Sequence, residues 1–179
     1  KNATFPYELD VNLHKIKLKN LTDIIIKNLK VVPKSYRAGR YGLDKIGLKF
    51  IEELGYQVDT SVTPLTNWGS DFRKAPVVPY FLNHEDLCKE GSSNVLEVPV
   101  TIDINLPYYL KNIYRIMPEK IKGALSYIKI KRLWLRPSFA SSKEMIKFSK
   151  MLIRNNLPIM NMMFHSSELT TYSSPFNKT

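Results

Sequence analysis

The chain has 179 residues, 44% of them hydrophobic and 24% charged, a composition typical of a globular protein with one sizeable core. It has no run of 18 apolar residues that would span a membrane, and its first residues lack the apolar segment of a signal peptide. The net charge of +11 favours anionic partners, but the lysines are scattered along predicted helices, as on solvated faces. Only residues 129–132 form a tight basic run, so we favour a solvated basic surface over a nucleic-acid interface.

Helices and short strands alternate along the chain. The spacing of apolar residues and the positions of caps and prolines predict helices at 13–29, 43–54, 107–117, 118–127 and 141–155. Runs rich in β-branched and apolar residues predict strands at 35–38, 56–59, 96–102, 133–135 and 158–164. Between residues 60 and 94 no period holds for long, and a loop of that length in a compact domain is usually functional or disordered. The alternation predicts one α/β domain with mainly parallel strands and helices outside them.

Polar residues stand at the ends of four predicted strands: Arg37, Asp59, Arg136 and His165. In a parallel barrel such ends converge on one face, so we expect these side chains to share a cleft. Glu97 lies inside an apolar strand, where a carboxylate is costly to bury without a partner, and the two arginines are the candidate partners.

Several kinds of catalytic and metal site are excluded because their sequence motifs are absent. The three histidines, His14, His84 and His165, are far apart in the sequence and show no metal-ligand spacing. No P-loop, dinucleotide fingerprint or serine-nucleophile elbow occurs. The single cysteine, Cys88, rules out an internal disulfide and a multi-cysteine metal site.

A family resemblance rests on segments that occur in one order along the chain: SYRAGRYG at 35–42, YQVDTSV at 56–62, LEVP at 96–99 and FHSSEL at 164–169. With them the chain resembles polysaccharide deacetylases of the NodB-homology family (carbohydrate esterase family four), in particular the WalW-like branch, over about residues 20–176. The resemblance implies a distorted (β/α) barrel that removes acetyl groups from the N-acetylated sugars of a polysaccharide or glycoconjugate. In such enzymes a divalent metal, usually zinc, polarises the acetyl carbonyl and activates water.

The resemblance also implies roles for individual residues. His165 matches the general acid that protonates the leaving amine, and Arg37 the arginine that orients the base aspartate. Asp59 falls in the segment that supports the catalytic histidine. The backbone N–H of Tyr41 matches an oxyanion-hole donor, in a turn one residue longer than the usual R-x-P-Y-G. For substrate binding we expect Arg136 in the cleft, and Trp68 or Phe72 stacking on a sugar ring, with a local packing anchor as the alternative role of Trp68.

The chain departs from the family at its start, because the paired aspartates and the histidine pair that hold the metal lie upstream of the matched region. We therefore expect residues 1–179 to be an N-terminally incomplete deacetylase domain that binds no catalytic metal by itself and is inactive alone. An open sheet edge, covered by the missing part or by another chain, should follow. A catalytically inactive carbohydrate-binding relative and a basic interaction module are the alternatives.

Overall fold

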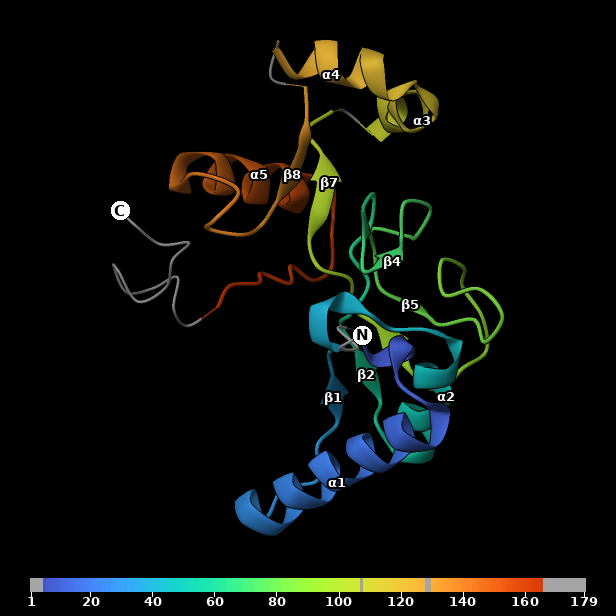
Figure 1. The fold of residues 1–179 in the computed structure, drawn as a ribbon. Coiled ribbons are helices and arrows are strands. Elements are labelled where there is room, and N and C mark those ends of the chain that lie inside the picture. Colours follow the sequence, from blue (N-terminus) through green and yellow to red (C-terminus); the bar gives the residue numbers. More distant parts are fainter. Residues whose placement is uncertain (1–4, 107, 128–129, 166–179) are drawn as a thin grey trace. The chain divides into compact units, whose positions relative to one another are not determined.

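The computed structural model describes residues 5–106, 108–127 and 130–165, and the chain forms two compact units, Lys1–Pro99 and Val100–Thr179. The predicted α/β class is confirmed, since the first unit contains a mainly parallel four-stranded sheet with helices packed on it (Figure 1). The described residues contain no closed barrel. No helix in the described part of the chain is long and apolar enough to cross a membrane.

The helices of the first unit begin at aspartate caps. A short 3₁₀ helix, η1 (Pro6–Glu8), leads into α1 (Val11–Leu29), where the Asp10 carboxylate accepts the N–H groups of Asn12 and Leu13. A second 3₁₀ turn, η2 (Gly39–Tyr41), precedes α2 (Lys45–Glu53), where Asp44 caps the N–H of Gly47. Both α-helices lie within two or three residues of their predicted bounds, because caps and apolar spacing specify them locally.

The sheet of the first unit has the order β1 (Ser35–Tyr36), β2 (Val58–Asp59), β6 (Leu96–Glu97), β5 (Tyr80–Phe81). The first three strands are parallel, as predicted, and β5 pairs antiparallel with β6. α2 packs on this sheet through Leu48 and Ile51, which are fully buried in the core. The predicted strand 96–102 breaks at Pro99, which has no N–H to continue a ladder.

The region predicted as irregular, 60–94, also holds short strands. Besides β5, it contains an antiparallel hairpin formed by β3 (Asn67–Trp68) and β4 (Ser70–Asp71). Gly69 joins the two strands with a positive φ of 87°, a conformation that favours glycine. The hairpin follows the carboxyl end of β2 and therefore stays close to the end of the parallel sheet.

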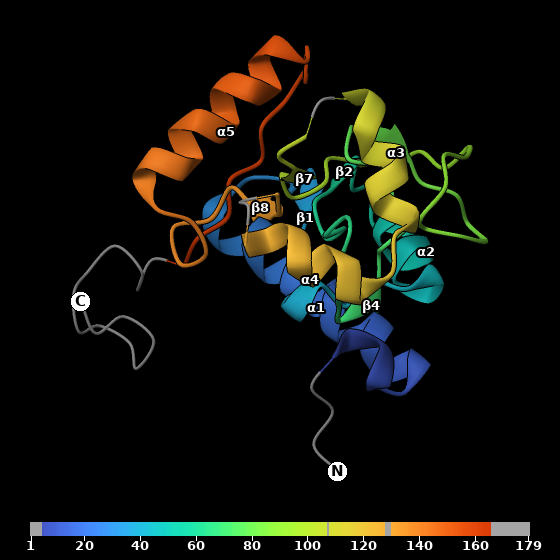
Figure 2. The same ribbon diagram turned by 90° about the horizontal axis from the view of Figure 1, so that it is seen from above.

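The second unit pairs β7 (Ile102–Ile104) with β8 (Arg132–Trp134) in antiparallel register, so the predicted parallel pairing is wrong for this strand. Between them lie α3 (Tyr108–Ile116) and α4 (Glu119–Tyr127), which run in different directions (Figure 2). α5 (Ser142–Arg154) starts with the predicted capping box of Ser141 and Glu144. Its Phe148 and Leu152 side chains pack against β8.

The prediction of a strand at 158–164 that is buried on both faces is wrong. This segment is not a strand, and of its side chains Ile159, Met160, Met162 and Phe164 are 38–48% exposed. It is held by hydrogen bonds from the Thr101 N–H to the Asn161 carbonyl and from the Met163 N–H to the Leu135 carbonyl. This run of apolar residues thus has the sequence pattern of a buried strand but does not form one.

Candidate functional site

Polar side chains gather where the three parallel strands of the first unit end. Asp59, the last residue of β2, pairs in register with Tyr36 of β1 on one side and with Glu97 of β6 on the other. Arg37 follows β1 directly. Ligands of parallel α/β sheets bind at the carboxyl ends of the strands, so this end of the sheet is the candidate functional site.

Asp59 and Glu97 form a buried acid pair at this end. Neither carboxyl group is exposed to solvent. Asp59 accepts the Ser61 N–H at 2.7 Å and the Ser61 hydroxyl at 2.8 Å, whereas Glu97 accepts the Val62 N–H at 3.1 Å. Asp59 and Glu97 are neighbours in the register of β2 and β6, and the Oε2 atom of Glu97 has no hydrogen-bond partner among the described residues, so a proton on one of the two carboxyl groups would join them.

The proton of this pair belongs to Glu97. Burial, followed by the negative charge of Asp59, raises the pKa of Glu97 well above its ordinary value. Burial also raises the pKa of Asp59, but the hydrogen bonds from Glu97 and Ser61 oppose that shift. The directions of these shifts favour Glu97 as the proton donor and Asp59 as the acceptor. From the sequence we expected an arginine to pair with the buried Glu97. In the structure the partner of Glu97 is Asp59.

Arg37 is exposed and is attached to the same end of the sheet. Its Nε–H donates to the carbonyl oxygen of Thr60 at 3.2 Å and to the Thr60 hydroxyl at 2.9 Å. The neighbouring Ala38 N–H donates to the Ser61 hydroxyl at 2.8 Å, and that hydroxyl donates to Asp59. The charge of Arg37 also lowers the pKa of Glu97 against the larger effect of burial. The end of β1 and the acid pair thus form one network.

The turn after β1 is strained. Arg40 and Tyr41 both have positive φ values, 55° and 61°, in a region that non-glycine residues rarely adopt. Strain of this kind concentrates at functional sites. The Tyr41 N–H donates to the Ala38 carbonyl at 3.0 Å, which occupies the donor on which the predicted oxyanion hole depends. The predicted role of Tyr41 therefore does not fit this conformation of the turn.

Trp68 projects from the β3–β4 hairpin beside this turn. The residue is 47% exposed, and its ring centroid lies 6.5 Å from that of the buried Tyr41 ring. Phe72, the other residue expected to stack on a sugar, is instead 1% exposed and belongs to the core, so it is not available for stacking. Trp68 is thus the exposed aromatic residue that accompanies Arg37 at this end of the sheet.

The segment before α1 holds the hairpin and the turn together. The Tyr7 hydroxyl donates to the Gly69 carbonyl at 2.8 Å, and the Tyr7 ring stacks on Phe5 with centroids 5.1 Å apart. The guanidinium of Arg40 lies over the other partner of this stack, 5.4 Å from the Phe5 centroid. The sequence did not predict these contacts, because nothing in it connects residues 5–7 with residue 69.

The remaining predicted site residues belong to the second unit. Arg136 is 8% exposed, and its guanidinium lies over the Phe139 ring, 4.8 Å from the centroid. His165 is exposed. The FHSSEL segment extends beyond it into residues that lie outside the described ones. The shared cleft joins residues of both units and stays a prediction.

The described residues do not fit a zinc site. The Nε2 atom of His84 is 2.7 Å from a Glu52 carboxylate oxygen, and His14 is buried with its ring edge on Phe50. The buried carboxyl oxygens of Asp59 and Glu97 already accept hydrogen bonds from Ser61 and from the Val62 N–H. Among the described residues, no three histidine, cysteine or acidic side chains are arranged to hold a metal ion.

Comparisons with family models, curated proteins and solved structures find no match to this chain.

Proposed function

We propose that this chain is part of a hydrolase that removes acetyl groups from N-acetylated sugars, and that it supplies the sugar-binding and proton-donating side of the site. One observation carries the proposal: an exposed tryptophan on the β3–β4 hairpin lies beside the strained turn that follows β1, at the end of the parallel sheet where Arg37 and the buried acid pair are found. The sequence resemblance to NodB-homology deacetylases supports the same reading.

The chemistry of these side chains suits a sugar ring. An exposed indole offers a large, rigid, amphipathic face to the apolar C–H face of a pyranose. The Tyr41 ring is a neighbour of the indole, tilted by 57° to it, and this contact limits the side-chain freedom that Trp68 loses on binding. The exposed guanidinium of Arg37 carries donors that match the hydroxyl and acetyl oxygens of such a ligand.

Deacetylation breaks the amide C–N bond after water attacks the carbonyl carbon, and the departing amine needs a proton. We assign that proton to His165, on the basis of the FHSSEL resemblance. The divalent metal of the family would polarise the carbonyl, but the described residues do not fit it, so the chain by itself is expected to bind sugar without releasing acetate.

A catalytically inactive sugar-binding relative is the second candidate. It is favoured by the Tyr41 N–H, which is bound within its own turn and not presented as an oxyanion donor. The two candidates share the sugar site and differ in whether acetate is released once the metal-binding part of the domain is supplied.

Calorimetric titration with the N-acetylglucosamine tetramer tests the sugar site. We expect saturable binding that Trp68→Ala weakens about tenfold, since loss of the stacking contact is worth about 1–2 kcal/mol. Phe81→Ala is the matched control, because Phe81 is equally exposed, at 48%, but lies on β5. Equal losses in both variants, or equal affinity for the deacetylated glucosamine tetramer, would contradict the proposal.

A further inference from the structure

The outer edge of β1 has unused hydrogen-bonding groups. The carbonyls of Lys34 and Tyr36 accept N–H groups of the β2 segment, so these residues face β2. Alternation along a strand therefore directs the N–H and C=O of Ser35 to the opposite side. Within the described ranges, no hydrogen bond to the backbone of Ser35 is present, and β1 is the terminal strand of its sheet.

A groove of about 300 Å³ lies next to this strand, lined by residues of α1, by the segment before it, and by Tyr36, the neighbour of Ser35 in β1. Its lining is mostly apolar and includes Pro6, Leu9, Leu18, Leu21, Tyr36 and Gly39. An open strand edge next to an apolar groove is the arrangement with which proteins bind an extended peptide as an extra strand.

α1 presents more apolar surface than the sheet covers. Only His14, Leu18 and Thr22 are buried, whereas Leu13, Ile16, Leu21 and Ile24 are 42–55% exposed. A crossover helix normally covers both of the parallel strands that it joins. Part of the apolar surface of α1 is therefore left uncovered by the described residues, and Leu21 of this surface lines the groove.

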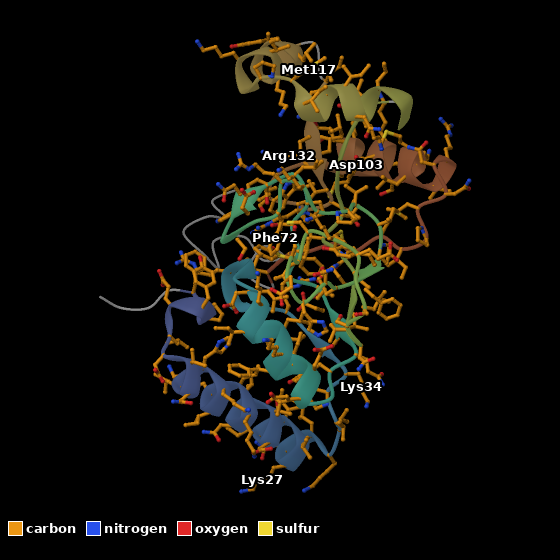
Figure 3. The ribbon with its side chains drawn as sticks, turned by 90° about the vertical axis from the view of Figure 1, so that its right-hand side faces the viewer. Lys27, Lys34, Phe72, Asp103, Met117 and Arg132 are labelled. Atoms are coloured by element: carbon orange, nitrogen blue, oxygen red, sulfur yellow. The ribbon has the colours of Figure 1, made fainter. Side chains whose placement is uncertain are left out.

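The direction of α1 fits the same arrangement. α1 and α2 lie side by side, and α2 is the crossover between the parallel strands β1 and β2 (Figure 3). The segment before α1 lies near the carboxyl end of β1, since Phe5 contacts Arg40 and Gly42. α1 ends near the amino end of β1 and so runs antiparallel to it, as a crossover helix does.

We propose that the outer edge of β1 binds an extended polypeptide strand that runs parallel to β1 and places alternate apolar side chains in the groove. Acidic residues at the intervening positions suit Lys17, which lines the groove, and the net charge of +11. That charge also disfavours a second copy of this chain as the occupant. The inference holds whether or not the chain binds sugars.

A peptide of about eight residues in which valine alternates with glutamate is the probe. At about 1 mM peptide, we expect the Ser35 amide signal to shift and its hydrogen exchange to slow at least tenfold. The Phe81 amide, on the opposite edge of the sheet, is the internal control. Ser35→Pro removes the outward N–H and leaves no amide signal at residue 35, so its effect is followed at Gly39, which lines the groove, and the peptide-induced shift of the Gly39 amide should be lost. Should that variant fail to fold, Leu21→Lys, a change of an exposed side chain, blocks the groove instead.

Spin labels on the peptide report its orientation. A label at the carboxyl end should broaden the signals of Phe5 and Gly39, and a label at the amino end those of Val32 and Lys34. The reverse pattern, no shift at Ser35, or unchanged binding by Ser35→Pro would overturn the inference. So would a dimer of the chain that Ser35→Pro dissociates, because a second copy would then be the occupant. None of these results depends on sugar binding, so the proposed function is tested separately.

Discussion

Asp59 and Glu97 face each other directly across the parallel strands β2 and β6, and both carboxyl groups are fully buried. Such a pair is stable only while one member is protonated, since two charged carboxylates would repel in a site without water. Through Ser61 and Ala38 the pair is connected to the end of β1 that carries Arg37. The pair therefore organises the end of the sheet at which we place the functional site.

The proton on Glu97 makes stability depend on pH. Because the pKa of Glu97 is raised in the folded protein, the folded state binds more protons than the unfolded state above the ordinary value of 4.5. This contribution is fully present below that pH and is lost as pH rises through the folded pKa, at about 1.4 kcal/mol per pH unit.

Glu97→Gln removes this titration but keeps an amide that donates to Asp59. We expect the variant to be the more stable protein at pH 7–8, and the difference between the two proteins to vanish toward pH 4. Urea denaturation across this pH range measures it. A difference that is constant with pH would show that Glu97 is not protonated in the folded protein.

Arg37 should influence the same titration. Its positive charge lowers the pKa of Glu97, so Arg37→Gln should move the Glu97 titration to higher pH, as followed by NMR of its side-chain carboxyl carbon. Arg40→Gln is the control, because it removes the same charge from the same turn. Equal shifts in both variants would mean that net charge, not the placement of Arg37, controls the pair.

The hairpin of Trp68 depends on a close approach at Gly69. A Cβ at this position would lie 2.5 Å from the carbonyl oxygen of Arg40, and φ is positive. Gly69→Ala should therefore cost clearly more stability than Gly55→Ala, which has the same sign of φ but open space around it. We expect about 1 kcal/mol for Gly55→Ala and about 3 kcal/mol for Gly69→Ala. Similar losses in denaturant titrations would show that the hairpin is not packed on the turn.

A buried ion pair stabilises the second unit. Lys111 of α3 donates to Asp103 of β7, and the two side chains are 8% and 6% exposed. Lys111→Met leaves a buried charge without its partner and should cost about 3–5 kcal/mol. Adding Asp103→Asn should restore part of the loss, as measured by denaturation. A double variant as unstable as the sum of both single ones would contradict this account.

Local signals predicted the helices and failed for the long-range pairing. α1, α2 and α5 are specified by caps and apolar spacing within a few residues, and all three lie close to their predicted bounds. The strands of the first sheet have two residues each, too few to show a period. β1, β2 and β6 fall within strands predicted from composition, but β5 was not predicted, and the neighbours of β6 depend on chain segments far away in the sequence.

The same division between local signals and long-range pairing applies to the candidate site. The position of Arg37 and Asp59 at parallel strand ends was predictable, because both lie at the ends of short strands that the alternation of helices and strands predicts to be parallel. The Asp59–Glu97 pair was not, because it requires the register of β2 and β6. Phe72 and Trp68 are aromatic residues of one irregular region, and only packing decides that one is in the core and the other is exposed.

An NMR titration of the labelled chain with the N-acetylglucosamine tetramer tests whether the carboxyl end of the parallel strands binds N-acetylated sugars, as we propose. We expect saturable shifts of the Trp68 indole N–H and of the Arg37 and Ser61 amides, with smaller shifts for the glucosamine tetramer. Signals of these three residues that stay unchanged, or that respond equally to both sugars, would contradict it.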